Sequence, residues 1–306
     1  MGLQRHAIAL AAGFAVLWAT VPAPAQDKVR VLATFSILGD FAKNVGGDRV
    51  EVATLVGPNS DAHVYSPAPA DAKKIMAAKV VITNGLGFEG WMGRLVKASG
   101  TKAVPVVATK GIKARQQAAQ GHGHSHGHSH GTIDAHAWQS VANAKIYVAN
   151  IRAALVAADP AGKAAYEANA ATYLEKLDAL DKEVRAAVSA IPKDRRRIIT
   201  SHDAFGYFQE AYGISFIAPQ GVSTESEASA RDVARIITQI KKQKIPAVFL
   251  ENVTDPRLVQ RIAAESGAKI GGKLYSDALT DEKGEAPTYI DMMRFNLKQL
   301  VPALMH

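Results

Sequence analysis

Four side chains that could bind a metal ion are spread along the chain at wide intervals. His63, His136 and His202 are the only histidines outside the first 25 residues, a glycine and histidine tract and the final residue, and Asp277 follows them. Imidazole and carboxylate groups are ordinary ligands of divalent metals. Successive members lie roughly 70 residues apart, unlike the close pairs of zinc fingers or HExxH helices. A single site built from all four would have to lie between two halves of the chain.

All four residues fall where predicted strands or helices meet loops. His63 and His202 each come soon after a predicted strand, Asp277 follows another, and His136 in DAHAW stands just before a predicted helix. Open parallel sheets bind ligands beyond the carboxyl ends of their strands. Taken singly, each histidine is more often a packed or capped surface residue than a ligand. Their shared placement favours a metal site.

The elements that must position these residues alternate β-branched runs with amphipathic stretches, which is the pattern of parallel sheets covered by helices. Strands are predicted at Val29–Thr34, Val50–Val56, Val80–Asn84, Ala103–Val107, Arg197–Ser201, Ile214–Ala218, Ala247–Glu251 and Lys269–Leu274. Helices are predicted at Ser36–Val45, Ala70–Ala77, Gly90–Ser99, Ala230–Gln243 and Thr288–Leu300, with Ser36 as a capping residue. The predicted fold class is α/β, with a mostly parallel sheet flanked by helices in each half.

The stretch between the two halves is rich in alanine and leucine and is interrupted only at Asp159-Pro160. It predicts two consecutive helices, the second at residues 163–190. A helix of about 28 residues is about 40 Å long, enough to cross from one lobe to another. We therefore predict an N-terminal lobe at residues 26–162, a linking helix at residues 163–190 and a C-terminal lobe at residues 191–306.

A low-complexity segment, GHGHSHGHSHG at residues 121–131, carries five histidines at alternate positions: His122, His124, His126, His128 and His130. Such a segment cannot bury a core and is expected to be disordered without a ligand. We predict an auxiliary metal-binding loop with several weak sites. A solvated spacer and a cloning tag are the alternatives, although tags usually stand at a terminus.

The first 25 residues have the pattern of an export signal, with Arg5, an apolar stretch at Ala7–Val21 and a small-residue cleavage site ending at Ala25. The sequence contains no cysteine, which excludes thiolate ligands, disulfides and a cysteine-linked lipid anchor. We expect cleavage near Ala25 and a free protein in the periplasm.

The formal net charge of +8 raises the question of nucleic-acid binding. Basic residues such as Lys73, Lys74, Lys241 and Lys242 are dispersed along helical stretches and form no arginine-rich patch with interleaved aromatic residues. We interpret them as solvated helix faces and predict no nucleic-acid partner.

Four segments, DAHVYSP, DAHAW, SHDAFGYF and YSDAL, resemble the signature segments of the cluster A-I metal receptors of ABC importers, in particular the zinc-binding ZnuA/AztC-like receptors. The similarity spans the chain after residue 25. It implies two pseudo-symmetric α/β lobes joined by one long rigid helix, with the metal at their interface. The family pattern assigns metal-ligand roles to His63, His136, His202 and Asp277. Ala135 in DAHAW departs from the proline that is common in the family.

The resemblance also bears on the metal, because similar manganese receptors tend to have a carboxylate where this sequence has His202. Three imidazoles and one carboxylate favour Zn²⁺ over the harder Mn²⁺. Glu225 and Glu227 are candidates to accept a hydrogen bond from a ligand imidazole. Helix capping before residue 230 is the alternative interpretation of this acidic segment.

The predicted function is capture of Zn²⁺ in the periplasm and its delivery to an ABC permease, by a protein expected to be monomeric. A periplasmic zinc metallochaperone is a further candidate partner. A receptor for manganese or another divalent metal, a passive zinc buffer and an adhesin are the alternatives. A zinc hydrolase would need an open coordination position, which four protein ligands do not leave, so no enzymatic activity is expected.

Overall fold

The structure, a computed structural model, describes residues 27–101, 105–116, 133–225 and 227–305. The predicted export signal and the histidine tract at residues 121–131 lie outside the described residues. Among the described residues, no helix is long and apolar enough to cross a membrane.

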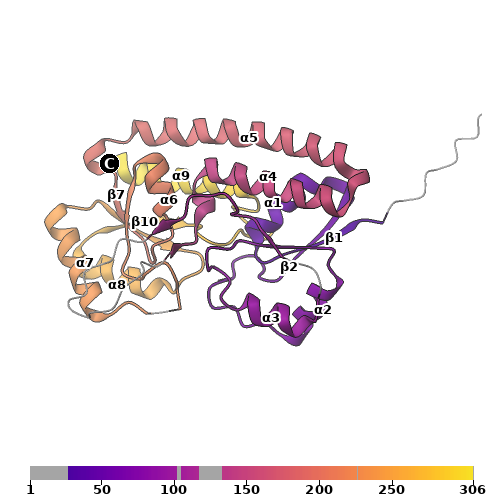
Figure 1. The fold of residues 1–306 in the computed structure, drawn as a ribbon. Coiled ribbons are helices and arrows are strands. Elements are labelled where there is room, and N and C mark those ends of the chain that lie inside the picture. The colour runs from indigo at the N-terminus through magenta and orange to yellow at the C-terminus, as the bar shows by residue number, and fades with distance from the viewer. Residues whose placement is uncertain (1–26, 102–104, 117–132, 226, 306) are drawn as a thin grey trace, which may run out of the picture.

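Two four-stranded parallel sheets form the centres of the two lobes (Figure 1). The first contains β1 (Val29–Ala33), β2 (Val50–Thr54), β3 (Val80–Thr83) and β4 (Val106–Val107), in the order β2-β1-β3-β4. The second contains β7 (Arg197–Ile199), β8 (Ser215–Ile217), β9 (Ala247–Glu251) and β10 (Lys269–Leu274), in the order β10-β9-β7-β8. If the four strands of each lobe are numbered 1 to 4 along the chain, both sheets have the order 2-1-3-4, the second being read from β8 to β10. The predicted α/β fold with two pseudo-symmetric lobes is confirmed.

Helices cover these sheets. They are α1 (Ser36–Gly46), α2 (Pro69–Ala77), α3 (Met92–Ser99), α4 (Val141–Ala158), α5 (Lys163–Ala190), α6 (Gly206–Tyr212), α7 (Ala230–Gln243), α8 (Pro256–Ser266) and α9 (Tyr289–Met305). Where a range was predicted, the observed bounds are close to it, whereas no range was predicted for α6 or α8. A short antiparallel ribbon of β5 (Arg115–Gln116) and β6 (Ile133–Asp134) was not predicted. Two-residue strands carry too little periodicity to be recognised in a sequence.

Helix α5 runs along both lobes, as the pink helix in Figure 1 shows. One stripe of this 28-residue helix, at three- and four-residue spacing, is buried against α1, α4 and α9. The residues of the stripe are Tyr166, Ala170, Tyr173, Leu177, Leu180, Val184 and Val188. The helix ends where Ile191 precedes Pro192, because a residue before proline disfavours the helical conformation. The lobes therefore share one continuous apolar layer beside α5, and the predicted long helix is confirmed.

The predicted capping role of Ser36 is wrong. Phe35 is the N-cap residue of α1, and no side chain caps this helix. The Ser36 hydroxyl instead accepts a hydrogen bond of 2.9 Å from the backbone N–H of Leu279 in the C-terminal half. A tertiary donor thus takes the oxygen that a local cap would use. Ser229, by contrast, does cap α7, since its hydroxyl accepts from the backbone N–H of Asp232.

A buried carboxylate, Asp40 on α1, ties three helices together. It accepts hydrogen bonds from the backbone N–H of Tyr289 at 3.0 Å and from the hydroxyl of Tyr173 at 3.3 Å. Burial raises the pKa of Asp40 to about 6, against the lowering effect of these bonds and of nearby Lys43. The folded protein therefore holds a proton on Asp40 at pH values where the unfolded chain has lost it.

This shift predicts a pH-dependent stability difference between the parent protein and Asp40→Asn. The stability that Asp40 contributes is present below its unfolded pKa of 3.8 and is lost as the pH rises through about 6. Between about pH 4 and pH 7, the parent should lose up to about 3 kcal/mol of unfolding free energy relative to the variant. Urea unfolding across this range measures the difference, with exposed Asp48→Asn as the control. Parallel profiles for the parent and Asp40→Asn would contradict the assignment.

Candidate metal centre

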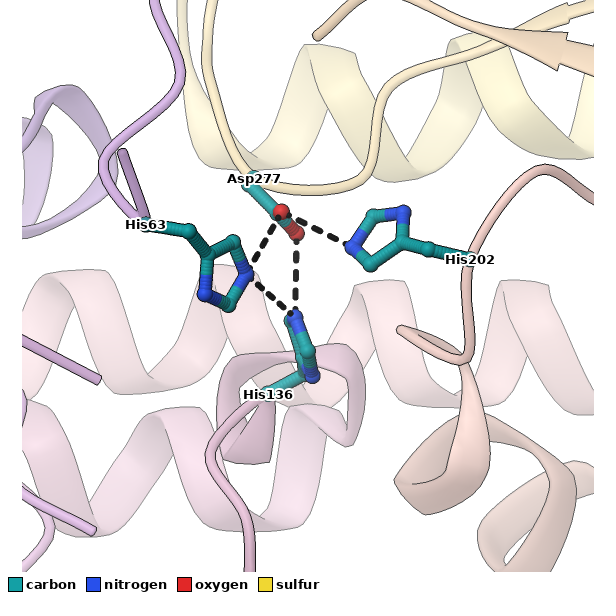
Figure 2. Close-up of side chains that lie close together, drawn as sticks. All are labelled: His63, His136, His202 and Asp277. Atoms are coloured by element: carbon teal, nitrogen blue, oxygen red, sulfur yellow. Dashed lines mark hydrogen bonds and ion pairs between the residues drawn. The ribbon is translucent and has the colours of Figure 1, made fainter. Parts of the chain in front are cut away.

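The structure brings the four predicted site residues together between the lobes (Figure 2). His63 lies in the loop between β2 and α2, His136 lies two residues after the end of β6, His202 follows β7, and Asp277 follows β10. Each offers one ligand atom, and these atoms all lie within 4.8 Å of one another. Two residues come from each half of the chain, so the site exists only when both lobes are in place.

The distances within the cluster are short and similar. The Nε2 atoms of His63 and His136 are 3.2 Å apart, and those of His63 and His202 lie 3.4 Å and 3.0 Å from Oδ2 of Asp277. His136 Nε2 is 3.5 Å from Oδ1 of the same carboxylate. The side chains of His136, His202 and Asp277 are fully buried, and that of His63 is 5% exposed. All three rings therefore point Nε2 at a common centre that is closed to solvent.

A carboxylate binds the backbone N–H of each of the three histidines. Asp61 accepts from His63 at 2.8 Å and Asp134 accepts from His136 at 3.0 Å, because the two DAH segments form the same turn. Glu251, at the end of β9, accepts from the backbone N–H of His202 at 3.0 Å. The repeated DAH sequence was a readable signal for the first two contacts. Nothing near His202 in the sequence pointed to Glu251.

Two of these carboxylates also contact the imidazole ring that they support. Asp134 lies 2.9 Å from Nδ1 of His136, and Glu251 lies 2.6 Å from Nδ1 of His202. This corrects the prediction for Glu225 and Glu227, both of which are exposed. Partners for a ring nitrogen buried between lobes must themselves be buried, and the exposed segment before α7 does not reach it.

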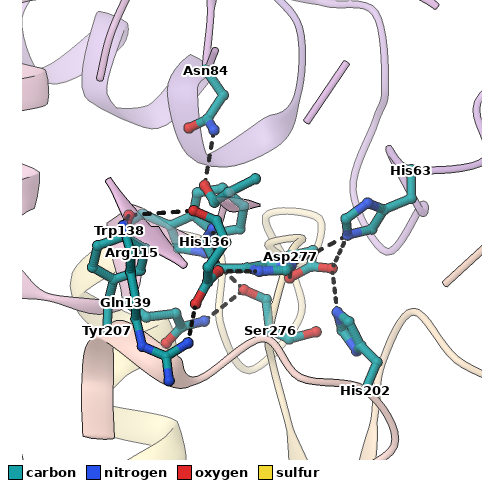
Figure 3. A network of polar contacts seen from close by, with 12 residues as sticks. His63, Asn84, Arg115, His136, Trp138, Gln139, His202, Tyr207, Ser276 and Asp277 are labelled. Atoms are coloured by element: carbon teal, nitrogen blue, oxygen red, sulfur yellow. Dashed lines mark hydrogen bonds and ion pairs between the residues drawn. The ribbon is translucent and has the colours of Figure 1, made fainter. Parts of the chain in front are cut away.

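Further polar contacts fix the loops around the cluster (Figure 3). Arg115 lies 3.1 Å from the second oxygen of Asp134 and balances its charge. Trp138 and Gln139, just after His136, both donate to the backbone oxygen of Ser276, at 2.9 and 2.7 Å. Since Ser276 precedes Asp277, these two bonds hold the ligand loops of the two lobes against each other.

The buried charges of the cluster perturb one another. Burial lowers the pKa of His136, but the charges of Asp277 and Asp134 and their hydrogen bonds raise it overall to about 9. The pKa of His202 is raised well above its usual value, because Glu251 and Asp277 outweigh the effect of burial. The two imidazoles hold the pKa of Asp277 well below its usual range despite burial. A cation bound at the centre takes the place of these protons.

One hydrogen bond joins the lobes beside His63. The hydroxyl of Thr224 donates to Oδ2 of Asp61 at 2.6 Å, while Oδ1 of the same aspartate holds the backbone of His63. A cavity of about 380 Å³ next to this bond is lined by both lobes, with Val64 on one side and Leu258 on the other. The His63 ring rests edge-on against Phe88, with centroids 4.7 Å apart.

Two parallel sheets on one spanning helix, with three imidazoles and a carboxylate buried between them, define a two-lobed metal-binding receptor. Residues 31–303 match the model of the family described as zinc-uptake complex component A, periplasmic, and the chain belongs to this family. The sequence resemblance to metal receptors of ABC importers is thereby confirmed at the level of the family.

Several relatives share this architecture over most of their length. Iron-binding protein YfeA of Yersinia pestis is 35% identical over 277 residues, 90% of this chain and 86% of its own. The manganese ABC transporter substrate-binding lipoprotein PsaA of Streptococcus pneumoniae is 32% identical over 283 residues, 91% of this chain and 90% of its own. The structure of the periplasmic zinc binding protein TroA from Treponema pallidum has a TM-score of 0.83 at 30% identity, covering 91% of this chain and all of that one.

The chain is therefore an extracytoplasmic metal-binding component of an ABC importer, which works with a membrane permease and an ATPase. It is a receptor and not an enzyme, as predicted. The named metals of its relatives include iron, manganese and zinc, so membership of the family does not itself decide the metal.

The bond between Thr224 and Asp61 predicts a kinetic effect on the bound metal. Thr224→Val removes a hydrogen bond to a carboxylate, worth about 1 kcal/mol at this partly exposed position, so metal should dissociate about fivefold faster. Stopped-flow transfer of metal to an excess of chelator measures the rate. Thr238→Val is the matched control, because Thr238 bonds only within an exposed turn of α7. Equal rates for parent and Thr224→Val would show that this contact does not restrain the site.

Proposed function

We propose that the chain is a zinc receptor that binds one Zn²⁺ through Nε2 of His63, His136 and His202 and through the carboxylate of Asp277. It carries the ion in the periplasm and delivers it to the permease. The observation that carries this proposal is the buried convergence of three imidazole nitrogens and one carboxylate. Zinc is the cargo of the protein.

The spacing of the ligand atoms supports zinc. A tetrahedral ion with Zn–N bonds of about 2.0–2.1 Å needs ligand atoms about 3.3 Å apart. Four of the contacts between these nitrogen and oxygen atoms are 3.0–3.5 Å long, and with one ligand atom from each residue all four atoms lie within 4.8 Å of one another. The ligand set is already compact, so the two lobes need little movement to form a tetrahedral site.

The chemistry of the donors points the same way. Imidazole suits zinc, whereas carboxylate and water oxygens suit the harder Mn²⁺. A third imidazole at His202 therefore favours zinc over manganese. The runner-up is a receptor for manganese or iron, which the names of PsaA and YfeA support. A passive zinc buffer is a further alternative, and it would bind zinc without transferring it to a permease.

The remaining parts of the proposal follow the sequence. An export signal cleaved near Ala25 would place the mature protein in the periplasm. The lobes are proposed to extend over residues 26–162 and 191–306, with residues 163–190 as the linking helix and a monomer as the working form. The histidines at residues 122–130 are proposed to capture zinc weakly and pass it to the buried site, and a metallochaperone is proposed as one zinc donor.

The metal preference can be tested with His202→Glu. Exchanging a borderline nitrogen for a hard oxygen should weaken zinc binding by about tenfold or more, or about 1.4 kcal/mol, and improve the affinity ratio of manganese to zinc. Competition of parent and variant against chelators of known affinity measures both metals. The parent should prefer zinc, and a parent that binds manganese more tightly would overturn the zinc proposal.

The matched control for this experiment is the double variant His202→Glu with Glu251→Gln. Glu251 lies 2.6 Å from the ring of His202, so the single variant places two acids side by side. The double variant carries one charge fewer there and should fold as the parent does. If either variant matches the parent in zinc affinity and metal ratio, His202 is not a ligand.

Deletion of residues 121–131 tests the auxiliary loop. All four proposed ligands lie outside this segment, so one tight zinc site should remain with its affinity changed by less than about threefold. Weak additional binding should disappear, since flexible imidazoles lose entropy on binding and cannot form a tight site. Calorimetric titration and stopped-flow zinc transfer from a donor protein measure these effects. Loss of the tight site on deletion would mean that the segment supplies a primary ligand.

A further inference from the structure

Glu251 is a buried acid whose oxygens all face the segment that carries His202. It is 4% exposed and is the last residue of β9, in the centre of the C-terminal sheet. Its Oε1 atom accepts from the backbone N–H groups of Ser201 at 2.7 Å and His202 at 3.0 Å. Its Oε2 atom lies 2.6 Å from Nδ1 of the His202 ring. One side chain thus holds both the backbone and the ring of this residue.

The contact with the ring has a consequence for the position of the proton. A neutral imidazole carries its proton on one nitrogen and a lone pair on the other, and only the lone pair binds a metal. A carboxylate oxygen 2.6 Å from Nδ1 favours the tautomer that carries its proton on Nδ1, because the oxygen attracts that proton and repels a lone pair. The lone pair then lies on Nε2, the atom that points at Asp277 and the centre of the cluster.

We propose that Glu251 is a positioning residue for metal binding, which fixes the tautomer and orientation of His202 and thereby favours zinc over manganese. This inference rests on the proposed zinc function and adds a residue that does not touch the metal. A carboxylate behind an imidazole makes its metal-binding nitrogen more basic. This increase in basicity would apply to His202. A nitrogen donor at this position distinguishes a zinc site from an oxygen-rich manganese site.

The corresponding acid in the other lobe differs in charge balance. Asp134 contacts Nδ1 of His136, but its second oxygen is paired with the guanidinium of Arg115. The contacts of Glu251 within the described residues are two backbone N–H groups and the ring. Its negative charge is therefore directed mainly through the ring of His202 to a cation bound on the far side. Glu251 is the acid whose replacement should change the metal site most.

Glu251→Gln is the direct test. The single amide oxygen of glutamine is required by the N–H groups of Ser201 and His202, so the amide NH₂ faces Nδ1. A donor at that place favours the tautomer with the proton on Nε2, which cannot bind metal. Zinc affinity should fall by about 10–100-fold, with a smaller loss for manganese. Chelator competition measures both, and circular dichroism of the metal-free variant checks folding.

Glu89→Gln provides the matched control. Glu89 is also buried and also accepts from two successive backbone N–H groups, those of Asn84 and Gly85. It also accepts a hydrogen bond from the hydroxyl of Thr34, and among the described residues no imidazole of the cluster forms a hydrogen bond or ion pair with it. The control removes a buried carboxylate of the same kind without changing the partner of His202. Its zinc affinity should remain within about threefold of the parent value, a difference of less than about 0.7 kcal/mol.

Nitrogen NMR of the zinc-loaded protein gives a readout that a purely structural role would not change. The parent should show a proton on Nδ1 of His202, shifted downfield by the nearby oxygen of Glu251, and the signal should move upfield or vanish in Glu251→Gln. The conservative variant Glu251→Asp keeps an acceptor and should bind zinc more tightly than Glu251→Gln. A glutamine variant with the parent's zinc affinity and Nδ1 signal would overturn the inference, as would an aspartate variant weaker than the glutamine one.

The proposed function and this inference fail in different ways. If the parent binds manganese in place of zinc, the zinc proposal fails, and the same variants decide the positioning role of Glu251 through manganese affinity. A loss in Glu251→Gln but not in Glu89→Gln supports that role, and equal losses overturn it.

Discussion

The constraint on which the structure depends is the convergence of three imidazole nitrogens and one carboxylate, whose ligand atoms all lie within 4.8 Å of one another. Such a cluster is costly to bury unless a cation balances it and each polar atom has a partner. The four residues come from two lobes, so a small change in the lobe arrangement would separate them. Helix α5 and the bonds from Trp138 and Gln139 to Ser276 oppose that change. The shared apolar layer therefore positions the metal ligands as directly as their own loops do.

The three histidines are not held equally. The rings of His136 and His202 each have a buried carboxylate oxygen close to Nδ1, at 2.9 and 2.6 Å. His63 is held through its backbone by Asp61, and its ring packs against Phe88. It is also the ligand with some exposure to solvent. The site thus combines two ligands whose rings lie beside buried carboxylates with one whose loop is joined to the other lobe by hydrogen bonds at Asp61 and Asn59.

The sequence was sufficient to predict the helix at Lys163–Ala190, strands β9 and β10, and the gathering of the four ligand residues. These features depend on long periodic patterns and on the rule that parallel strands carry ligands at their carboxyl ends. The hydrogen-bond partners were harder to predict. Ser36 binds a distant N–H in place of capping its helix, and His202 is supported by Glu251 almost fifty residues away. Such choices depend on which atoms the tertiary fold brings together, and local sequence does not contain that information.

The choice of metal follows from donor chemistry within a fold that serves several metals. YfeA and PsaA share about a third of their residues with this chain and are named for iron and manganese. The common scaffold therefore sets where an ion lies, and the ligand side chains and the groups behind them set which ion it is. In this chain the third nitrogen donor, His202, has a buried acid 2.6 Å from Nδ1 of its ring. An imidazole ligand is useful only with its lone pair directed at the metal. On the role proposed for Glu251, the nitrogen donor and the acid behind it therefore act as a pair.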